Sequence, residues 1–185
     1  KLNLKELESL QEDFALPIEP INLDGFKDKV DFNYSIWKKN NVRNHKTPGF
    51  SIVNISLTKL GSAPGDATSE QMRILAKLAD QYSSSEIRTT KRQTMVFPFV
   101  RKDQVFDLWK ALEENDLASP HEGTLAQIVA CPGRDYCDLA KAVSIPIATR
   151  VQERFNDMNK LLDIGDLKIN ISGCENSCAH HHIAD

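Results

Sequence analysis

All four cysteines of this 185-residue chain lie in its C-terminal third, and this clustering constrains the fold more than any other feature. Cys131 and Cys137 are separated by five residues, and Cys174 and Cys178 are separated by three. If the thiols act together, the fold must bring two distant loops side by side. Four thiolates from two loops suit a [4Fe–4S] cluster, and a structural zinc ion is the alternative. The wider of the two spacings favours the cluster, because structural zinc sites usually show shorter ones.

The residues around each pair also fit a metal centre. Cys131 begins a Cys-Pro-Gly sequence, a turn that lets backbone N–H groups approach the sulfur. If a helix begins at Cys174, its sulfur and that of Cys178 lie one turn apart on one face, where a helix N-terminus stabilises thiolates. Residues 180–182 are three histidines, which we expect to lie at the surface or behind the ligands rather than to bind the metal.

Composition and charge exclude some classes of partner. The net charge of −3 gives no signal for nucleic acid or for an anionic membrane surface. No apolar run approaches the ~20 residues that span a bilayer, and we see no basic-then-apolar leader, so we expect a cytoplasmic protein. In a reducing compartment, clustered cysteines favour metal ligation over disulfides. Because the chain starts at Lys1 and ends seven residues after its last cysteine, we expect a piece of a longer protein.

The middle of the chain predicts alternating strands and helices. Apolar and polar residues alternate over residues 50–58, which predicts a half-buried strand. Thr68 and Gln71 form a capping box at the start of a helix. Residues 86–100 predict one bent strand or two short ones, and we expect Asp103 to cap a second helix. Each helix is expected to bury the apolar residues of one face: Leu75, Leu78, Ala79 and Tyr82 in the first, and Val105, Leu108, Trp109 and Leu112 in the second.

This order predicts a split β-α-β unit of the ferredoxin-like kind over residues 49–118, and an α+β fold class. Residues 1–48 are expected to be a connecting segment with a short helix over residues 2–14. Residues 36–49 carry several lysine, arginine and histidine residues, and we interpret them as a solvated basic loop. The alternative is a loop that meets an anionic cofactor or an acidic partner.

Residues 119–185 predict a small α/β domain that holds the cysteines. One long helix is expected because apolar residues recur at helical spacing, and Gly165 is its expected end. The residues on this helical face are Val151, Phe155, Met158 and Leu162. Alternating apolar residues over 167–171 then predict a strand that leads directly to Cys174.

The two cysteine-bearing stretches, ACPGRDYCDLA and NISGCENSCAHHHIAD, resemble the paired cysteine motifs of the sirohaem-dependent sulfite and nitrite reductases. Two further stretches, HKTPGFSIVNISL and SEIRTTKRQTMVFPFV, resemble one ferredoxin-like repeat of these enzymes. The resemblance covers about residues 35–185. In this family a tandem pseudo-repeat encloses one sirohaem between its halves, and this chain resembles the C-terminal half only.

The resemblance implies a set of site residues. Cys131, Cys137, Cys174 and Cys178 would ligate a [4Fe–4S] cluster, and Cys178 would also be the catalytic bridge to the sirohaem iron. The residues implied to contact sirohaem or lie near it are Arg88, Thr90, Gln93 and Asn176, together with Arg92, which departs from the family pattern. Sirohaem carries many carboxylates, so arginine and amide donors suit its binding.

The resemblance also implies an activity and partners. The complete protein would be an oxidoreductase of sulfur assimilation that reduces sulfite to sulfide, or nitrite to ammonia, with electrons from reduced ferredoxin or a flavoprotein. The substrate-binding basic residues of the family lie largely in the N-terminal half, so we expect the isolated chain to be inactive. Two alternatives stay open: a related cobalt-corrin ring-oxidising protein, and a non-catalytic metal-binding or electron-carrier module.

Overall fold

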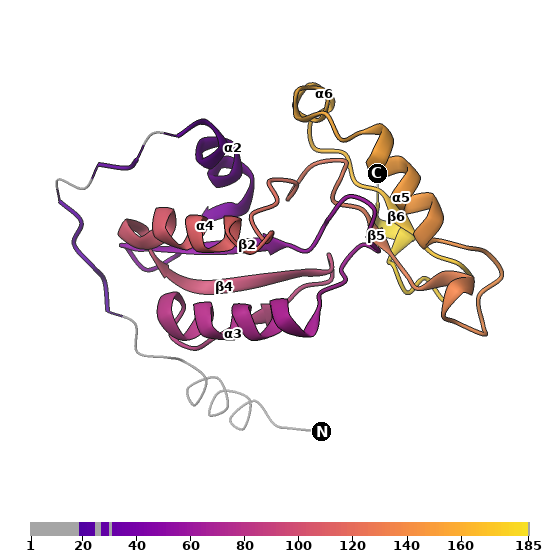
Figure 1. Cartoon of the computed structure of the whole chain (residues 1–185), viewed down its shortest axis with the longest axis horizontal. Helices are drawn as coiled ribbons and strands as arrows, with labels where there is room; N and C mark the ends of the chain where they lie inside the picture. Colours follow the sequence, from indigo (N-terminus) through magenta and orange to yellow (C-terminus); the bar gives the residue numbers. More distant parts are fainter. Residues whose placement is uncertain (1–18, 25–26, 30, 185) are drawn as a thin grey trace.

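The computed structural model describes residues 19–24, 27–29 and 31–184. It has an α+β fold, in which an antiparallel sheet packs with helices (Figure 1). A smaller C-terminal body holds α5 (Ile145–Arg154), β5 (Val129–Ala130) and β6 (Asn170–Ile171). The short helix predicted over residues 2–14 lies outside the described residues. No helix in the described part of the chain is long and apolar enough to cross a membrane.

The larger sheet contains four strands in the order β1-β2-β4-β3, and each neighbouring pair is antiparallel. The strands are β1 (Val42–Asn44), β2 (Phe50–Ser56), β3 (Arg88–Thr89) and β4 (Thr94–Arg101). The central pair, β2 and β4, aligns Val53 with Phe97 after a register shift next to Ser51. The strand predicted over residues 50–58 is confirmed, and residues 86–100 contribute two strands rather than one bent strand.

Three helices pack with this sheet: α2 (Phe32–Asn41), α3 (Ser69–Tyr82) and α4 (Val105–Glu113). The predicted capping box of α3 is confirmed. Thr68 Oγ1 accepts a hydrogen bond from Gln71 N at 3.1 Å, and Gln71 Oε1 accepts one from Thr68 N at 3.0 Å. This reciprocal pair satisfies two backbone donors that would otherwise be unpaired at the helix start.

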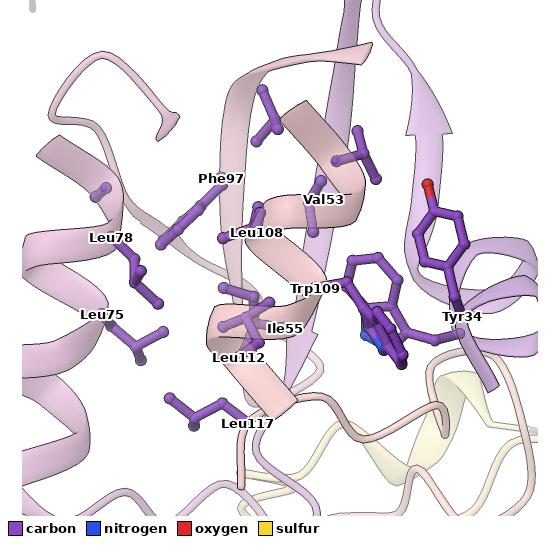
Figure 2. Close-up of a cluster of buried hydrophobic side chains, with 14 of the residues drawn as sticks. Tyr34, Val53, Ile55, Leu75, Leu78, Phe97, Leu108, Trp109, Leu112 and Leu117 are labelled. Atoms are coloured by element: carbon purple, nitrogen blue, oxygen red, sulfur yellow. The ribbon is translucent and has the colours of Figure 1, made fainter. Parts of the chain in front are cut away.

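Side chains from all three helices and from the sheet meet in one hydrophobic core (Figure 2). The predicted buried faces of α3 and α4 are confirmed. Of the eight residues predicted on these faces, seven are buried and Tyr82 is half-buried. The core residues are Tyr34, Trp37, Val53, Ile55, Leu57, Leu75, Leu78, Ala79, Phe97, Val100, Val105, Leu108, Trp109, Leu112 and Leu117. This core fixes the sheet to which the cysteine-bearing body is attached.

The interpretation of residues 36–49 as a loop is wrong for most of that segment. It contains the end of α2 and the edge strand β1. Asp31 caps α2 by accepting a hydrogen bond from Tyr34 N at 2.9 Å, and Tyr34 and Trp37 enter the core. The helical pattern is weak in the sequence because the other buried positions of α2 are asparagines.

Asp103 does not cap α4, which is a second correction. A short 3-10 turn, η1 (Lys102–Gln104), precedes the helix, and its Asp103 carboxylate accepts two hydrogen bonds from the Arg101 guanidinium, at 3.0 and 2.7 Å. This arrangement holds the pKa of the Asp103 carboxyl below its usual value, chiefly through the hydrogen bond from Arg101. A charge-assisted bidentate pair is stronger than a single capping bond, so the carboxylate turns away from the helix start.

The long helix predicted in the C-terminal third is two helices, α5 (Ile145–Arg154) and α6 (Met158–Ile164). The chain breaks between them because the Asp157 side chain accepts a hydrogen bond from Asn159 N at 2.9 Å and starts a new helix. The break changes the buried face, so that Leu161 is buried whereas Leu162 is 41% exposed. Gly165 ends α6 at φ +80°, as predicted.

The last predicted strand is shorter than expected. Only β6 (Asn170–Ile171) forms, and it pairs in parallel with β5 (Val129–Ala130). Leu167, at the start of the predicted strand, is 39% exposed and lies outside it. Small hydrophobic clusters around Leu125, Ile128 and Val129 hold this C-terminal body together.

Replacing Leu112 with alanine should lower the free energy of unfolding by about 2–5 kcal/mol, because Leu112 is fully buried and its loss leaves a cavity. The matched control is Leu60→Ala. Because Leu60 is 48% exposed, this change should lower the free energy of unfolding only slightly. Urea unfolding followed by circular dichroism measures both. Equal losses for the two variants would contradict the proposed core.

Candidate metal centre

The parallel pairing of β5 with β6 brings the two cysteine-bearing loops together. The pairing continues past the strands, because Cys131 N donates a hydrogen bond to Ile171 O at 3.1 Å. Parallel strands leave a sheet at the same edge. The loop after β5, which holds Cys131 and Cys137, therefore begins beside the loop after β6, which holds Cys174 and Cys178.

Gly173 joins these two loops through its backbone. Its N–H points to Cys131 Sγ at 3.1 Å, and its carbonyl oxygen accepts hydrogen bonds from Lys141 N at 2.9 Å and Ala142 N at 3.0 Å. A Cβ atom at this position would lie 2.6 Å from Ala142 O. Only glycine allows so close an approach, so the residue before Cys174 sets the spacing between the loops.

The Cys131 side chain is buried and held by polar groups. Ser144 Oγ lies 3.4 Å from Cys131 Sγ and donates a hydrogen bond to Cys131 O at 2.7 Å. Burial raises the pKa of the Cys131 thiol, but contacts from Ser144, Gly173 and Gly133 favour the thiolate more strongly and leave the pKa below its usual value. Gly133 has φ +62°, and a Cβ atom there would collide with Ser144 Oγ. The surroundings of Cys131 thus favour its thiolate form.

The other three cysteines are more exposed than Cys131. Cys137 and Cys174 are half-buried, and Cys178 is exposed. All four cysteines are free thiols. The helix considered at Cys174 does not form: residues 174–178 lie in turns, with Ser177 at φ +55°. Over the described ranges, no three Cys, His, Asp or Glu side chains lie together in a way that could hold a metal ion.

The histidines and Asn176 lie on the outer part of this second loop. His181 Nδ1 is 3.2 Å from Ser177 Oγ, and the His181 and His182 rings have centroids 4.0 Å apart. His180 begins the 3-10 turn η3 (His181–Ile183) at φ +54°. Asn176 is exposed.

Gln93, one of the implied cofactor contacts, joins the larger sheet to the cysteine loop. Its Nε2 donates a hydrogen bond to Ala130 O at 2.7 Å, and its Oε1 accepts one from Ala130 N at 3.0 Å. The side-chain amide thus pairs with a buried backbone in the manner of a neighbouring strand. Because Ala130 directly precedes Cys131, Gln93 fixes where the first cysteine pair begins.

The remaining implied contacts lie near one another in sequence, but each already has a protein partner. Arg88 Nε is 2.5 Å from Glu86 Oε1. Arg92 Nε lies 3.8 Å from Glu122 Oε1. The Thr90 hydroxyl lies 2.8 Å from that of Thr94.

Several other polar residues, which no sequence pattern indicates, join the sheet and α2 to the C-terminal body. Gln127 is buried, with its Oε1 bonded to the Ser56 hydroxyl and its Nε2 donating to Arg92 O at 3.4 Å. Asn40 Nδ2 donates to Pro120 O at 2.7 Å, and Asn41 Nδ2 donates to Ser119 O at 3.0 Å. The sequence does not distinguish a buried glutamine or asparagine from an exposed one. These hydrogen bonds are therefore seen only in the folded structure.

A cavity of about 460 Å³ lies beside the first cysteine, where Ala130, Pro132 and Tyr136 face Gln93 and the loop of residues 63–66. Among the described residues that line it, Asp66 is the one with a charged side chain. The cavity therefore offers no cation to a ligand rich in carboxylates.

Comparison with known proteins agrees with this arrangement. Residues 47–115 match the model of the nitrite/sulfite reductase ferredoxin-like half domain. A sulfite reductase [ferredoxin] 2 of Mycolicibacterium paratuberculosis is 30% identical over 143 residues, covering 74% of this chain and 26% of that protein. The chloroplastic ferredoxin–nitrite reductase of Spinacia oleracea is 27% identical over 146 residues, which are 78% of this chain and 23% of the relative.

A solved structure gives the same fold. The Mycobacterium tuberculosis NirA protein superimposes with a TM-score of 0.58 at 23% identity, covering 95% of this chain and 31% of that one. The fold is thus a ferredoxin-like half domain followed by a cysteine-bearing body. Residues 47–115 are therefore a ferredoxin-like half domain of the nitrite/sulfite reductase kind, and the chain spans about a quarter of the length of the curated relatives described above.

Replacing Gln93 with alanine should lower the free energy of unfolding by about 1–3 kcal/mol, because both backbone groups of the buried Ala130 lose their partner. Hydrogen exchange at Ala130 N–H should become faster. The control is Gln81→Ala, an exposed position in α3 where alanine is well tolerated. Unchanged exchange at Ala130 in the Gln93 variant would contradict this link.

Proposed function

We propose that this chain is part of a haemoprotein that reduces sulfite or nitrite, and that Cys131, Cys137, Cys174 and Cys178 ligate a [4Fe–4S] cluster. The observation that carries the proposal is the parallel β5–β6 pair, which starts both cysteine loops at one edge and turns Gly173 N–H toward Cys131 Sγ. Four thiols in two adjoining loops form a donor set for iron–sulfur chemistry. The names of the relatives, sulfite reductase and nitrite reductase, support the same reading.

The residues present fit a cluster by their chemistry. All four cysteines are free, and the surroundings of Cys131 favour its thiolate. Hydrogen bonds to the sulfurs tune cluster potentials, and the Gly173 N–H is placed to supply one. Since no three candidate ligands of the described chain are grouped to hold a metal, we propose that the more exposed loop, with Cys174 and Cys178, adjusts as the cluster assembles.

The described residues do not form a complete sirohaem pocket. The Gln93 amide is used by Ala130, and Arg88 and Arg92 have carboxylate neighbours. We therefore propose that sirohaem is held mainly by an N-terminal half of a longer protein, which would also supply the substrate-binding cations. Cys178, the most exposed of the four thiols, is the proposed contact from this chain to the sirohaem iron. When bound, the cluster and sirohaem would deliver electrons to sulfite or nitrite.

The proposal assigns limited roles to the residues of this chain. The half domain of residues 49–118 supports the cysteine body of residues 119–185, and Gln93 fixes the start of the Cys131 loop. Gly173 N–H and Ser144 hold Cys131 in a form that favours the thiolate. We propose reduced ferredoxin as the electron donor, a flavoprotein being the alternative, and a cytoplasmic setting in which the thiols stay reduced.

Anaerobic reconstitution of the 185-residue chain with iron and sulfide should yield one four-iron cluster per chain, measured by metal and sulfide analysis and by the spectrum of the reduced protein. Each cysteine-to-serine variant should lose most of the cluster. Asp138→Asn is the matched control, because this exposed residue follows Cys137 without being a thiol. Stoichiometric zinc without sulfide would overturn the cluster assignment.

The reductase activity needs a separate test. Sirohaem and the proposed N-terminal half of the longer protein are added to the reconstituted chain. The mixture should show a haem spectrum and should oxidise a reduced dye when sulfite or nitrite is present. A stable cluster with no such activity would favour the electron-carrier alternative. In Cys178→Ser, electronic coupling between the cluster and the haem should be lost; retained coupling would show that the bridging role is wrong.

A further inference from the structure

Another cavity, of about 690 Å³, lies at the end of the sheet away from the cysteines. Its lining comes from α2, β1, the beginning of β2 and the start of α4, which Figure 1 shows on the side opposite β5 and β6. The far end of β2, at Ser56, is the end bonded to Gln127 of the C-terminal body. Neither a cysteine nor an implied sirohaem contact is among the described residues that line the cavity. An inference about it therefore stands independently of the proposed reductase chemistry.

Positive charge dominates this cavity. The charged residues that line it are Asp28, Lys29, Lys38, Lys39, Arg43 and Lys102. The one carboxylate among them, that of Asp28, forms an ion pair with Lys38. For the other four cations, no carboxylate in the described part of the chain lies within ion-pair distance. The repulsion among these four charges would fall if an anion bound between them.

Two of the cations are held in place by the fold. Arg43 Nη1 donates a hydrogen bond to Lys39 O at 3.1 Å, so the guanidinium stays beside the end of α2. The Asp28 carboxylate, which pairs with Lys38, also accepts a hydrogen bond from the hydroxyl of the core residue Tyr34 at 3.0 Å. Charges that are already positioned lose less conformational freedom when a ligand binds.

A serine hydroxyl on the sheet adds a neutral donor. Ser51 of β2 is 4% exposed and pairs with Asn44 of β1, two residues along each strand from the pair Val42–Val53. Val53 lies in the core beneath the helices, and Val42 packs against that core. Because side chains alternate between the faces of a strand, Ser51 and Asn44 point to the same helix-covered face, where both line the cavity. No described residue hydrogen-bonds to the Ser51 hydroxyl, which is therefore available to a ligand.

The start of α4 adds a partial positive charge. Val105, the first residue of this helix, lines the cavity. No side chain caps α4, and the nearby Asp103 carboxylate is bonded to Arg101 instead. Backbone N–H groups at a helix start attract anions. The cavity thus combines lysine side chains, a serine hydroxyl and an uncapped helix start, which are groups that proteins use to bind phosphate.

We infer that this cavity binds a small molecule that carries a diphosphate group, with Lys39, Lys102 and the Ser51 hydroxyl binding its phosphate oxygens. A phosphate group carries about 1.5 to 2 negative charges at neutral pH, so two of them balance the four cations that lack a carboxylate partner. One phosphate would leave about half of that charge unbalanced. The volume lies within the range of small-molecule sites, and it leaves room for the rest of an ester beside the phosphates.

Titration of the 185-residue chain with inorganic pyrophosphate at constant ionic strength tests this inference, with amide signals followed by nuclear magnetic resonance. The signals of Asn44, Ser51 and Val105 should shift saturably, whereas that of Cys131 should not move. Pyrophosphate should bind roughly tenfold more tightly than orthophosphate, because it contacts more of the cations. Shifts that do not saturate, or that sodium chloride reproduces at equal ionic strength, would overturn the inference, since charge screening alone would explain them.

Adenosine diphosphate in the same titration identifies the source of the diphosphate group. Tighter binding than that of pyrophosphate would assign the cavity to a diphosphate ester, and weaker binding would assign it to the free ion. Adenosine, which has no phosphate, is the control. Adenosine that bound as tightly as adenosine diphosphate would show that the phosphates are not recognised and that the inference is wrong.

Two lysine variants identify the binding cations. Lys39→Gln and Lys102→Gln should each weaken pyrophosphate binding by roughly three- to tenfold, because each removes one charged contact. Lys77→Gln is the matched control, since Lys77 is an exposed lysine of α3 that does not line the cavity. Equal losses of affinity in Lys77→Gln and Lys39→Gln would show a general charge effect and would contradict a site in this cavity.

A further variant separates binding from folding. Ser51→Ala removes a hydroxyl that has no partner among the described residues, so the thermal midpoint without anion should not fall. Its affinity for pyrophosphate should nevertheless drop by roughly threefold or more. In the unaltered chain, pyrophosphate should raise the thermal midpoint, because a ligand of the folded state stabilises that state. Full affinity in Ser51→Ala would show that the anion does not reach the sheet, and the inference would fail.

Discussion

The parallel pairing of β5 with β6 is the constraint on which the candidate metal centre depends. Each strand is only two residues long, so the pair has little stability of its own. It is extended by backbone bonds from Cys131 and by the contacts of Gly173, and it is fixed to the larger sheet by the amide of Gln93. The position of the cysteine loops therefore follows from a side chain in a different body of the molecule.

The junction between the two bodies is mostly polar. Gln93, Gln127, Asn40 and Asn41 reach across it, and each bonds to a backbone carbonyl. Such bonds define direction better than apolar contacts do, because a displaced amide leaves a buried group unpaired. These bonds hold the start of the cysteine loops at a defined place, while Cys178 and the outer part of its loop stay exposed.

The sequence predicted the features that local patterns determine. The capping box at Thr68, the buried face of α4 and the helix end at Gly165 follow from nearby residues alone. Asp103 failed as a cap because Arg101 competed for it, and the long helix failed because Asp157 started a new one. For the candidate site, clustering predicted that the cysteine loops meet, but no pattern reveals that the Gln93 amide has a backbone partner.

The unequal cores of the two bodies have a consequence for how the chain opens. The sheet and its helices share one large core, whereas the cysteine-bearing body has three small clusters and a pair of two-residue strands. Local unfolding begins where few apolar side chains are buried, so the C-terminal body is the unit that opens at lower free energy while the sheet stays folded. A metal centre bound by its four thiols would stabilise this body against local unfolding. Unfolding of the two bodies would then become more cooperative as metal occupancy rises.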